Sequence, residues 1–252
     1  MQRYFIEANN WQEQTLIVDG EDFHHIVHVM RMKPGESFIA SQNNGQAAVC
    51  EVMSITDETI EARVKEWLNE TVELPVSVTI AQGIPKGDKW ETILQKGTEL
   101  GASSFIPFQA DRSVAKWDQK KVVKKLDRWR KIVKEASEQS HRNVIPSVDE
   151  VISVQQLIDR RSMYDCCLFA YEEETRTSNS QTFDYYLSKL KQAENVLLCI
   201  GPEGGFSQAE AEALKQSGFS AVRLGPRILR TETASLYALS CISYKFEEMQ
   251  GQ

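Results

Sequence analysis

The pattern of apolar and polar positions along the chain changes near residue 73. Before that point, short runs rich in β-branched and aromatic residues alternate with turn residues such as Lys33-Pro34-Gly35 and Asn43-Asn44-Gly45. Runs of this length between turns are typical of strands in a small β domain. The pattern predicts a small β-barrel over residues 1–72, with one short helix near residues 22–31 and a boundary at Leu74-Pro75.

From residue 76 onwards, runs that are apolar on both faces alternate with stretches of helical character. Strands without a polar face belong to parallel sheets that helices cover on both sides. The alternation therefore predicts an α/β domain over residues 73–252. The predicted strands span 76–84, 103–110, 165–173, 195–203 and 220–229, and the predicted helices span 87–100, 118–140, 153–160, 180–192, 207–217 and 233–248.

Three of the predicted strands end in unusual sequences: LFAYEE from residue 168, GPEGG from residue 201 and LGPRILRTETA from residue 224. Ligands of open parallel sheets lie beyond the carboxyl ends of the strands, and glycines let backbone groups approach a ligand closely. GPEGG matches neither the dinucleotide motif nor the P-loop, and Glu203 favours a neutral or cationic ligand over a phosphate. The structural alternative is a tight turn into a helix that Ser207-Gln208-Ala209-Glu210 would cap.

The sequences GPEGG and LGPRILRTETA resemble the signature of the SPOUT-class ribosomal RNA methyltransferases. Within that class they resemble the family that methylates N3 of a uridine in 16S ribosomal RNA of the small ribosomal subunit. Further matches at residues 25–35, 94–101, 111–112 and 138–146 extend the resemblance over nearly the whole chain. It implies an N-terminal PUA-like β-barrel over residues 1–72, a C-terminal SPOUT α/β domain with a deep trefoil knot over residues 73–252, and a homodimer.

The resemblance also implies that the knotted loops bind S-adenosylmethionine. The sulfonium of this cofactor is a cation, which tolerates carboxylates nearby. The implied cofactor-binding residues are Leu168, Phe169, Ala170, Glu172, Gly201, Pro202, Glu203, Gly204, Gly205, Leu224, Gly225, Ile228, Leu229, Arg230, Thr231, Thr233 and Ala234.

Methylation at N3 of uridine requires the loss of a proton with a pKa of about 9 to 10, similar to that of a phenol. A positioned carboxylate can accept this proton, and a guanidinium can stabilise the charge that develops on the uracil oxygens. Glu232 and Arg230 lie on the third loop and are the candidates for these roles, with Arg142 as a further catalytic candidate. Structural ion pairs are the alternative for all three residues.

The charge distribution points to an RNA-binding face, although the net charge is −7. Residues 112–142 contain eleven Lys/Arg and four Asp/Glu, whereas residues 1–72 contain five Lys/Arg and twelve Asp/Glu. A basic block can contact phosphates on an acidic protein, and a solvated helix face is the alternative. The candidate RNA-binding residues are Arg3, His25, Arg31, Lys33, Lys86, Lys89, Arg112, Lys116, Lys120, Lys121 and Lys124.

The cysteines, the apolar runs and the histidines bear on the compartment of the protein and on metal binding. An odd number of cysteines without a C-x-x-C pair, together with the absence of an apolar leader or spanning run, predicts a cytoplasmic protein that uses no membrane. His24 and His28 have a metal-pair spacing but no evident third ligand, so no metal is predicted. His141 stands where the family pattern has glycine.

Two other functions stay open, a ribose 2′-O-methyltransferase of the same class and a non-enzymatic RNA-binding protein. The second of these would leave the three loop motifs without a purpose. A nicotinamide enzyme is disfavoured because its glycine motif, and the acidic residue that follows it, are absent.

Overall fold

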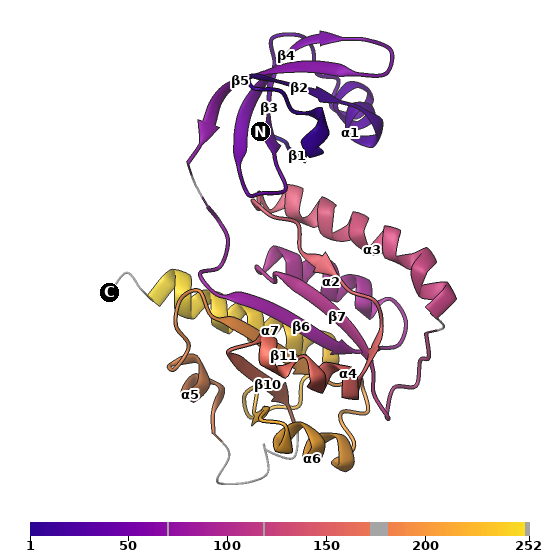
Figure 1. The fold of residues 1–252 in the computed structure, drawn as a ribbon, viewed down its shortest axis with the longest axis vertical. Helices are drawn as coiled ribbons and strands as arrows, with labels where there is room; N and C mark the ends of the chain where they lie inside the picture. The colour runs from indigo at the N-terminus through magenta and orange to yellow at the C-terminus, as the bar shows by residue number, and fades with distance from the viewer. Residues whose placement is uncertain (70, 118, 172–180, 250–252) are drawn as a thin grey trace. The chain divides into compact units, whose positions relative to one another are not determined.

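The computed structural model describes residues 1–69, 71–117, 119–171 and 181–249. The chain forms two compact units, Met1–Glu73 with Lys134–Ile145, and Leu74–Val133 with Pro146–Gln252 (Figure 1). The segment Lys134–Ile145, which the sequence groups with the second domain, therefore belongs to the first unit.

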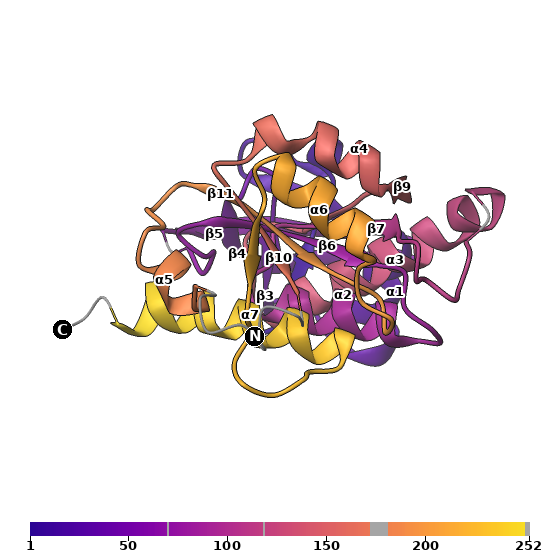
Figure 2. The same cartoon turned by 90° about the horizontal axis from the view of Figure 1, so that it is seen from below.

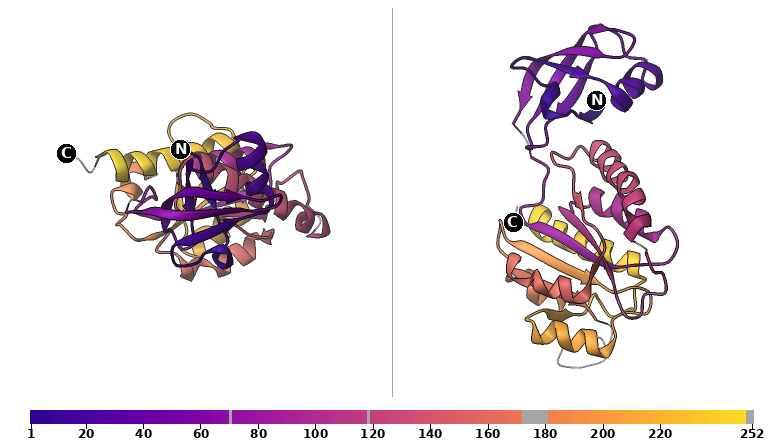
Figure 3. Two further views of the ribbon diagram at one scale, coloured as in Figure 1. Left: turned by 90° about the horizontal axis from the view of Figure 1, so that it is seen from above. Right: turned by 45° about the vertical axis from the view of Figure 1, so that its right-hand side comes forward.

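The first unit is built on a five-stranded sheet in the order β1-β3-β4-β5-β2. Its strands are β1 (Arg3–Phe5), β2 (Thr15–Val18), β3 (Ser37–Ser41), β4 (Ala47–Ile55) and β5 (Ile60–Leu68). All neighbouring pairs are antiparallel except β1 with β3. Two register shifts interrupt the β4–β5 ladder, and such bulges bend a strand and increase its twist. The sheet is accordingly curled (Figure 3).

The core of this unit lies inside the curled sheet, where Leu16, Phe38, Cys50 and Ile60 are fully buried. The helix α1 (Gly20–His24) and a π-helical turn (His25–Val29) place Phe23 and Ile26 against the same core. The predicted helix near residues 22–31 is thus present, although it begins and ends slightly earlier.

The end of α3 (Gln119–Gln139) and the residues after it are bound to this unit by polar contacts. Lys134 Nζ lies 2.7 Å from Asp22 Oδ1 and 2.6 Å from Glu138 Oε1, and the Glu138 carboxylate accepts a hydrogen bond from the Phe5 amide at 3.2 Å. Arg142 is 4% exposed and forms an ion pair with Glu73. These contacts explain why Lys134–Ile145 groups with the first unit.

The second unit contains a parallel sheet in the order β12-β10-β11-β6-β7-β8, with β9 also paired to β7. The strands are β6 (Ser77–Gly83), β7 (Ser104–Gln109), β8 (Ser147–Val148), β9 (Ile152–Ser153), β10 (Cys166–Ala170), β11 (Asn195–Ile200) and β12 (Ser220–Val222). The described pairs are all parallel, which confirms the predicted sheet.

The predicted strand 220–229 is too long. β12 ends at Val222, and the following residues form a loop that contains Gly225 at φ +78° and Pro226. Neither residue suits a strand interior. The short strands β8 and β9 were not predicted, because two residues give no alternation to detect.

Helices cover both faces of the sheet (Figure 2). On one face, α4 (Val154–Asp159) and α6 (Gln208–Gln216) place Leu157 and Leu214 in the cluster that includes Phe169. On the other face lie α2 (Lys89–Glu99) and α7 (Thr231–Ser243), which is followed by a π-helical turn (Tyr244–Glu248). The helix α5 (Phe183–Leu187) is shorter than the predicted 180–192, and short 3-10 helices span Ala8–Asn10 and Arg161–Met163.

The contact between α2 and the sheet depends on one glycine. A Cβ at Gly97 would lie 2.7 Å from the Phe105 ring and 3.6 Å from Leu239 of α7. Glycine therefore lets α2 lie close to β7 and α7 at the same point. Within the described residues, no helix combines the length and apolar character that crossing a bilayer requires.

Candidate active site

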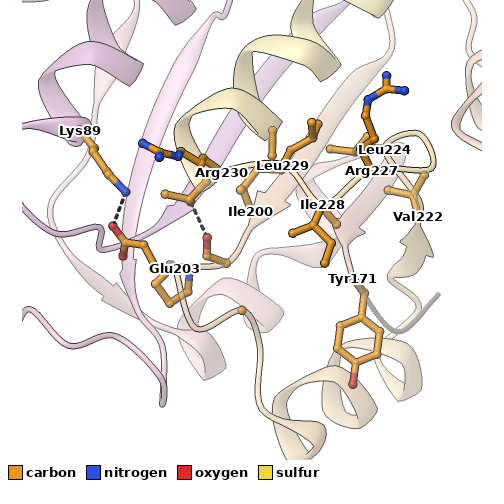
Figure 4. A pocket seen from close by; sticks show the side chains of 16 residues that line it. Lys89, Tyr171, Ile200, Glu203, Val222, Leu224, Arg227, Ile228, Leu229 and Arg230 are labelled. Carbon is orange, nitrogen blue, oxygen red and sulfur yellow. Dashed lines mark hydrogen bonds and ion pairs between the residues drawn. The ribbon is translucent and has the colours of Figure 1, made fainter. Parts of the chain in front are cut away.

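A cavity of about 410 Å³ opens at the carboxyl ends of three neighbouring strands of the second unit (Figure 4). Ala170 of β10 is in register with Ile200 of β11 and with Val222 of β12, so these strands end at the same level of the sheet. The loops that follow, with the start of α7 and of α2, form the walls. The lining residues are Lys89, Ala170, Tyr171, Ile200, Gly201, Pro202, Glu203, Gly205, Val222, Leu224, Arg227, Ile228, Leu229, Arg230, Thr231 and Ala234.

The GPEGG loop folds tightly back on itself at the end of β11. Gly205 has φ +65°, in the region that favours glycine, and its amide donates to Pro202 O at 2.8 Å. A Cβ at Gly201 would lie 3.0 Å from the backbone of Gly205, and one at Gly83 would lie 2.5 Å from the Pro202 ring. The glycines therefore allow backbone to pack on backbone at the cavity wall.

Gly204 has a different reason to be glycine. A Cβ there would lie 2.9 Å from Arg112 Cβ, and Arg112 Nη1 donates to Gly204 O at 3.1 Å. The segment Asp111-Arg112 thus holds the outer side of the loop, whereas Gly201 and Gly205 line the cavity.

The loop passes directly into α6 through a capping box, as predicted. The Ser207 side chain accepts from the Glu210 amide at 3.2 Å, and Glu210 Oε2 accepts from the Ser207 amide at 2.7 Å. Glu210 Oε1 also accepts from the Asp111 amide at 2.8 Å, and Ser207 Oγ donates to Asp111 Oδ2 at 2.7 Å. These bonds hold the C-terminal end of the GPEGG loop.

A buried hydrogen-bond network connects β6, the GPEGG loop and α7. Gln82 Nε2 donates to Thr231 Oγ1 at 2.7 Å, and Thr231 Oγ1 donates in turn to Gly201 O at 2.6 Å. Ser235 Oγ donates to Gln82 Oε1 at 2.8 Å. Gln82 and Ser235 are fully buried, so each of these bonds matters to the fold. The network fixes the start of α7 against the end of β11.

Three charged side chains meet at one end of the cavity. Lys89 Nζ lies 2.8 Å from Glu203 Oε1 (Figure 4). It also lies 3.4 Å from Glu232 Oε2, in the first turn of α7. Burial raises the pKa of the Glu203 carboxyl, but the hydrogen bonds from Lys89 and from backbone amides outweigh it and keep that pKa below its usual value. The hydrogen bond to Glu203 raises the pKa of Lys89.

The structure gathers most of the predicted cofactor-binding residues around this cavity, but not all of them. Leu168 and Phe169 are buried in the core, and Gly204 contacts Arg112 instead. Gly225 and Thr233 do not belong to the wall, and Glu172 lies outside the described residues. Sequence reasoning missed Tyr171, Ile200, Val222 and Arg227, which also line the cavity. Ile200 and Val222 line the cavity because both are in register with Ala170, a predicted cofactor-binding residue.

The catalytic candidates have different positions. Arg230 is exposed and lines the cavity, immediately before α7, and Glu232 lies in the first turn of that helix. Arg142, by contrast, belongs to the first unit, where its buried guanidinium is paired with Glu73. This ion pair favours the structural alternative for Arg142, and its catalytic role stays a prediction.

The candidate RNA-binding residues also divide into two groups. Arg3 is 2% exposed and donates to Arg142 O at 2.9 Å, so it is not a surface residue. His25 is half-buried, with Nδ1 2.9 Å from Tyr4 Oη, and Lys89 is engaged by two carboxylates. The exposed candidates are Arg31, Lys33, Lys86, Arg112 and Lys116, and the backbones of Lys120, Lys121 and Lys124 lie on α3.

The fold and the site define a class of protein. Residues 72–243 match the family model described as an RNA methyltransferase domain, and residues 18–65 match the RNA methyltransferase PUA domain. The curled sheet of the first unit is therefore PUA-like, and the parallel-sheet unit is an RNA methyltransferase domain.

The relatives narrow this class further. The chain is 50% identical to the ribosomal RNA small subunit methyltransferase E of Bacillus subtilis, over 100% of this chain and 99% of that protein. It is 37% identical to the protein of the same name from Mycobacterium tuberculosis, over 90% of this chain and 85% of that protein. The chain belongs to the ribosomal RNA small subunit methyltransferase E family.

Two solved structures share the whole architecture. The ribosomal RNA small subunit methyltransferase E of Neisseria gonorrhoeae, bound to S-adenosylmethionine, is 28% identical with a TM-score of 0.85, over 99% of both chains. A methyltransferase of Legionella pneumophila in complex with the same cofactor is 30% identical with a TM-score of 0.83, over 96% of both chains.

Proposed function

We propose that this chain transfers the methyl group of S-adenosylmethionine to N3 of a uridine in 16S ribosomal RNA of the small ribosomal subunit. The observation that carries this proposal is the convergence of three motif-bearing loops on one cavity at the carboxyl ends of β10, β11 and β12. The names of the relatives support the substrate class, and the two structural neighbours with bound cofactor support S-adenosylmethionine.

The residues of the cavity fit this cofactor. The volume of about 410 Å³ lies within the range of small-molecule sites, and Ile200, Val222 and Leu224 give an apolar wall for a purine. Gly201 and Gly205 bring backbone groups to the surface of the cavity, where a Cβ at Gly201 would collide with the loop. Glu203 adds a carboxylate that is paired with Lys89, so this end of the cavity carries both charges. When bound, S-adenosylmethionine supplies a methyl group activated by the positive sulfonium.

The residues of this chain would position the uridine and move its proton. In the proposed mechanism the Glu232 carboxylate accepts the N3 proton, and the Arg230 guanidinium donates to the uracil oxygens on which negative charge develops. Both residues lie at the start of α7, which the Gln82–Thr231 network fixes against the GPEGG loop. A fixed alignment of nitrogen and methyl group contributes to the rate on its own.

The proposed enzyme is a cytoplasmic homodimer of the SPOUT class with a deep trefoil knot in its second domain. Large apolar side chains on and beside α7 are exposed in the single chain, as a dimer surface would require. They are Ile228, Tyr237, Tyr244 and Met249, which are 72%, 37%, 61% and 49% exposed.

RNA contacts would come from the exposed basic residues of both units, since phosphates attract Lys and Arg without regard to sequence. Arg31 and Lys33 would serve in the PUA-like unit, and Arg112 and Lys116 in the other.

The test uses tritiated S-adenosylmethionine and small ribosomal subunits from a strain that lacks this gene. After methyl transfer, the RNA is digested to nucleosides and the labelled nucleoside is identified by chromatography. We expect the label in 3-methyluridine. Label in a 2′-O-methyl nucleoside would instead assign the protein to the ribose methyltransferases. No transfer, with no binding of the cofactor by calorimetry, would leave an RNA-binding protein.

A further inference from the structure

Lys89 is the cation of the three-residue charge cluster at the cavity. It begins α2 and so comes from a part of the chain that carries none of the three loop motifs. Its ammonium group is 2.8 Å from Glu203 Oε1 of the GPEGG loop and 3.4 Å from Glu232 Oε2 in the first turn of α7. The three side chains are 30%, 28% and 19% exposed, so water only partly screens their charges.

We propose that Lys89 is a positioning residue that holds Glu203 and Glu232 on one ammonium group, and thereby sets the spacing between the GPEGG loop and the start of α7, which would enclose the cofactor and the target base. This inference rests on the proposed methyltransferase function, because it assigns Lys89 a role in that same site. It replaces the sequence-based assignment of Lys89 as an RNA contact.

Electrostatics supports this role. Without Lys89, two carboxylates would face one another across a partly buried gap, and like charges at that range repel. The repulsion would separate the GPEGG loop from the start of α7, and would move Glu232 away from the position proposed for proton acceptance.

Glu203 has a second anchor beside Lys89. Its Oε1 also accepts a hydrogen bond from the Lys86 amide at 3.1 Å, so this one oxygen connects the β6–α2 loop with the GPEGG loop. A phosphate bound by Lys89 would have to displace Glu203 from the ammonium group. The observed geometry therefore favours an internal role for Lys89.

The principal test compares K89Q with K96Q. Lys96 is a matched control because it lies on the same helix and forms an exposed ion pair with Glu99 at 2.7 Å, away from the cavity. We expect K89Q to weaken binding of S-adenosylmethionine about tenfold by calorimetry, because the cofactor would then have to order a GPEGG loop that has lost its charge-assisted hydrogen bond from Lys89. K96Q should bind the cofactor like the natural protein. K89R, which keeps the charge, should recover most of the affinity.

Methyl transfer gives a second readout. We expect K89Q to lower kcat more than it raises KM for RNA, because Lys89 acts through Glu232 and not on phosphate. A loss confined to KM for RNA, together with a weaker salt dependence of RNA binding, would overturn the proposal in favour of a phosphate contact.

A double-mutant cycle separates this inference from the proposed function. The unfolding midpoints of K89Q, E203Q and the double variant are measured in urea without any ligand. Coupled residues give a double variant that is little worse than the worse single variant. If the natural protein binds no S-adenosylmethionine, the proposed function fails while the cycle still tests the pair. Strict additivity, or unchanged cofactor affinity in K89Q, would overturn the role of Lys89.

Discussion

At the scale of single residues, His141 has a backbone conformation that few residues other than glycine adopt. Its φ is +57°, directly after α3, where the Arg142 amide donates to Ser137 O at 2.9 Å and so closes the helix. A left-handed residue at this position is the usual helix terminator, and a Cβ there costs about 1 kcal/mol. The family pattern of glycine at this position has its physical reason in this turn.

We therefore expect H141G to raise the free energy of unfolding by about 0.5 to 1 kcal/mol, measured by urea denaturation. H141A is the matched control, because it removes the imidazole and keeps the unfavourable φ. If H141A is stabilised as much as H141G, the side chain and not the backbone is the cause.

At the scale of elements, the active site depends on how α7 is fixed to the sheet. Gln82 is at the end of β6, and its side chain amide connects Thr231 and Ser235 of α7, while Thr231 donates to Gly201 O at the end of β11. Gln82 lies about 150 residues before Thr231 and Ser235, and within the described residues the three side chains bond to one another and to neighbouring backbone carbonyls. The Gln82 side chain therefore fixes the start of α7, which forms one wall of the cavity, against the GPEGG loop, which forms another.

Replacing Gln82 by leucine should cost about 2 to 3 kcal/mol of stability, because buried hydroxyl and carbonyl groups lose their partner. We also expect weaker binding of S-adenosylmethionine by calorimetry, since Thr231 lines the cavity. S235A, which removes a single donor, should cost about 1 kcal/mol and leave the affinity nearly unchanged. Equal losses in both variants would contradict a central role for Gln82.

At the scale of the whole molecule, both units bury free thiols. Burial raises the pKa of Cys50 in the first unit to about 12, and that of Cys166 and Cys167 in the second unit to about 11. Burial also raises the pKa of Cys199 well above its usual value. The folded protein therefore keeps these thiols protonated at pH values at which the unfolded chain has begun to lose their protons.

The sign of the resulting pH dependence follows from proton linkage. Above the ordinary thiol pKa of about 8.5, the unfolded state binds fewer protons than the folded state, so stability falls as the pH rises towards 11 to 12. We expect the urea midpoint to decrease between about pH 8 and pH 10, and the decrease to be smaller in C199A than in the natural sequence. An equal slope in C199A would exclude this thiol as a cause.

Local sequence was sufficient for much of the fold. Turn residues and β-rich runs predicted the β-rich first unit, and the runs without a polar face predicted the parallel sheet, because side-chain periodicity is set by backbone geometry. The capping box at Ser207 and Glu210 was correct for the same local reason. The strands β8 and β9 have two residues each, which is too few to show an alternation of apolar and polar side chains.

Motifs in the sequence identified the loops of the site. Which residues of these loops line the cavity depends on contacts that form only in the folded chain. Gly201 and Gly204 are separated by two positions, yet one lines the cavity and the other accommodates Arg112. Arg230 was a catalytic candidate in the sequence and Arg142 a further one, and the folded chain buries Arg142 against Glu73 while Arg230 is exposed at the cavity.

The sequence by itself determined the two kinds of unit, the strand ends that carry the motifs, and the family, since these depend on periodicity and on residue types at fixed spacing. Only the tertiary structure decided that Lys134–Ile145 groups with the PUA-like unit, that Ala170, Ile200 and Val222 end at one level, and that Lys89 meets Glu203 and Glu232. Strand order and long-range ion pairs depend on which surfaces pack together, and no local pattern of the chain encodes that choice.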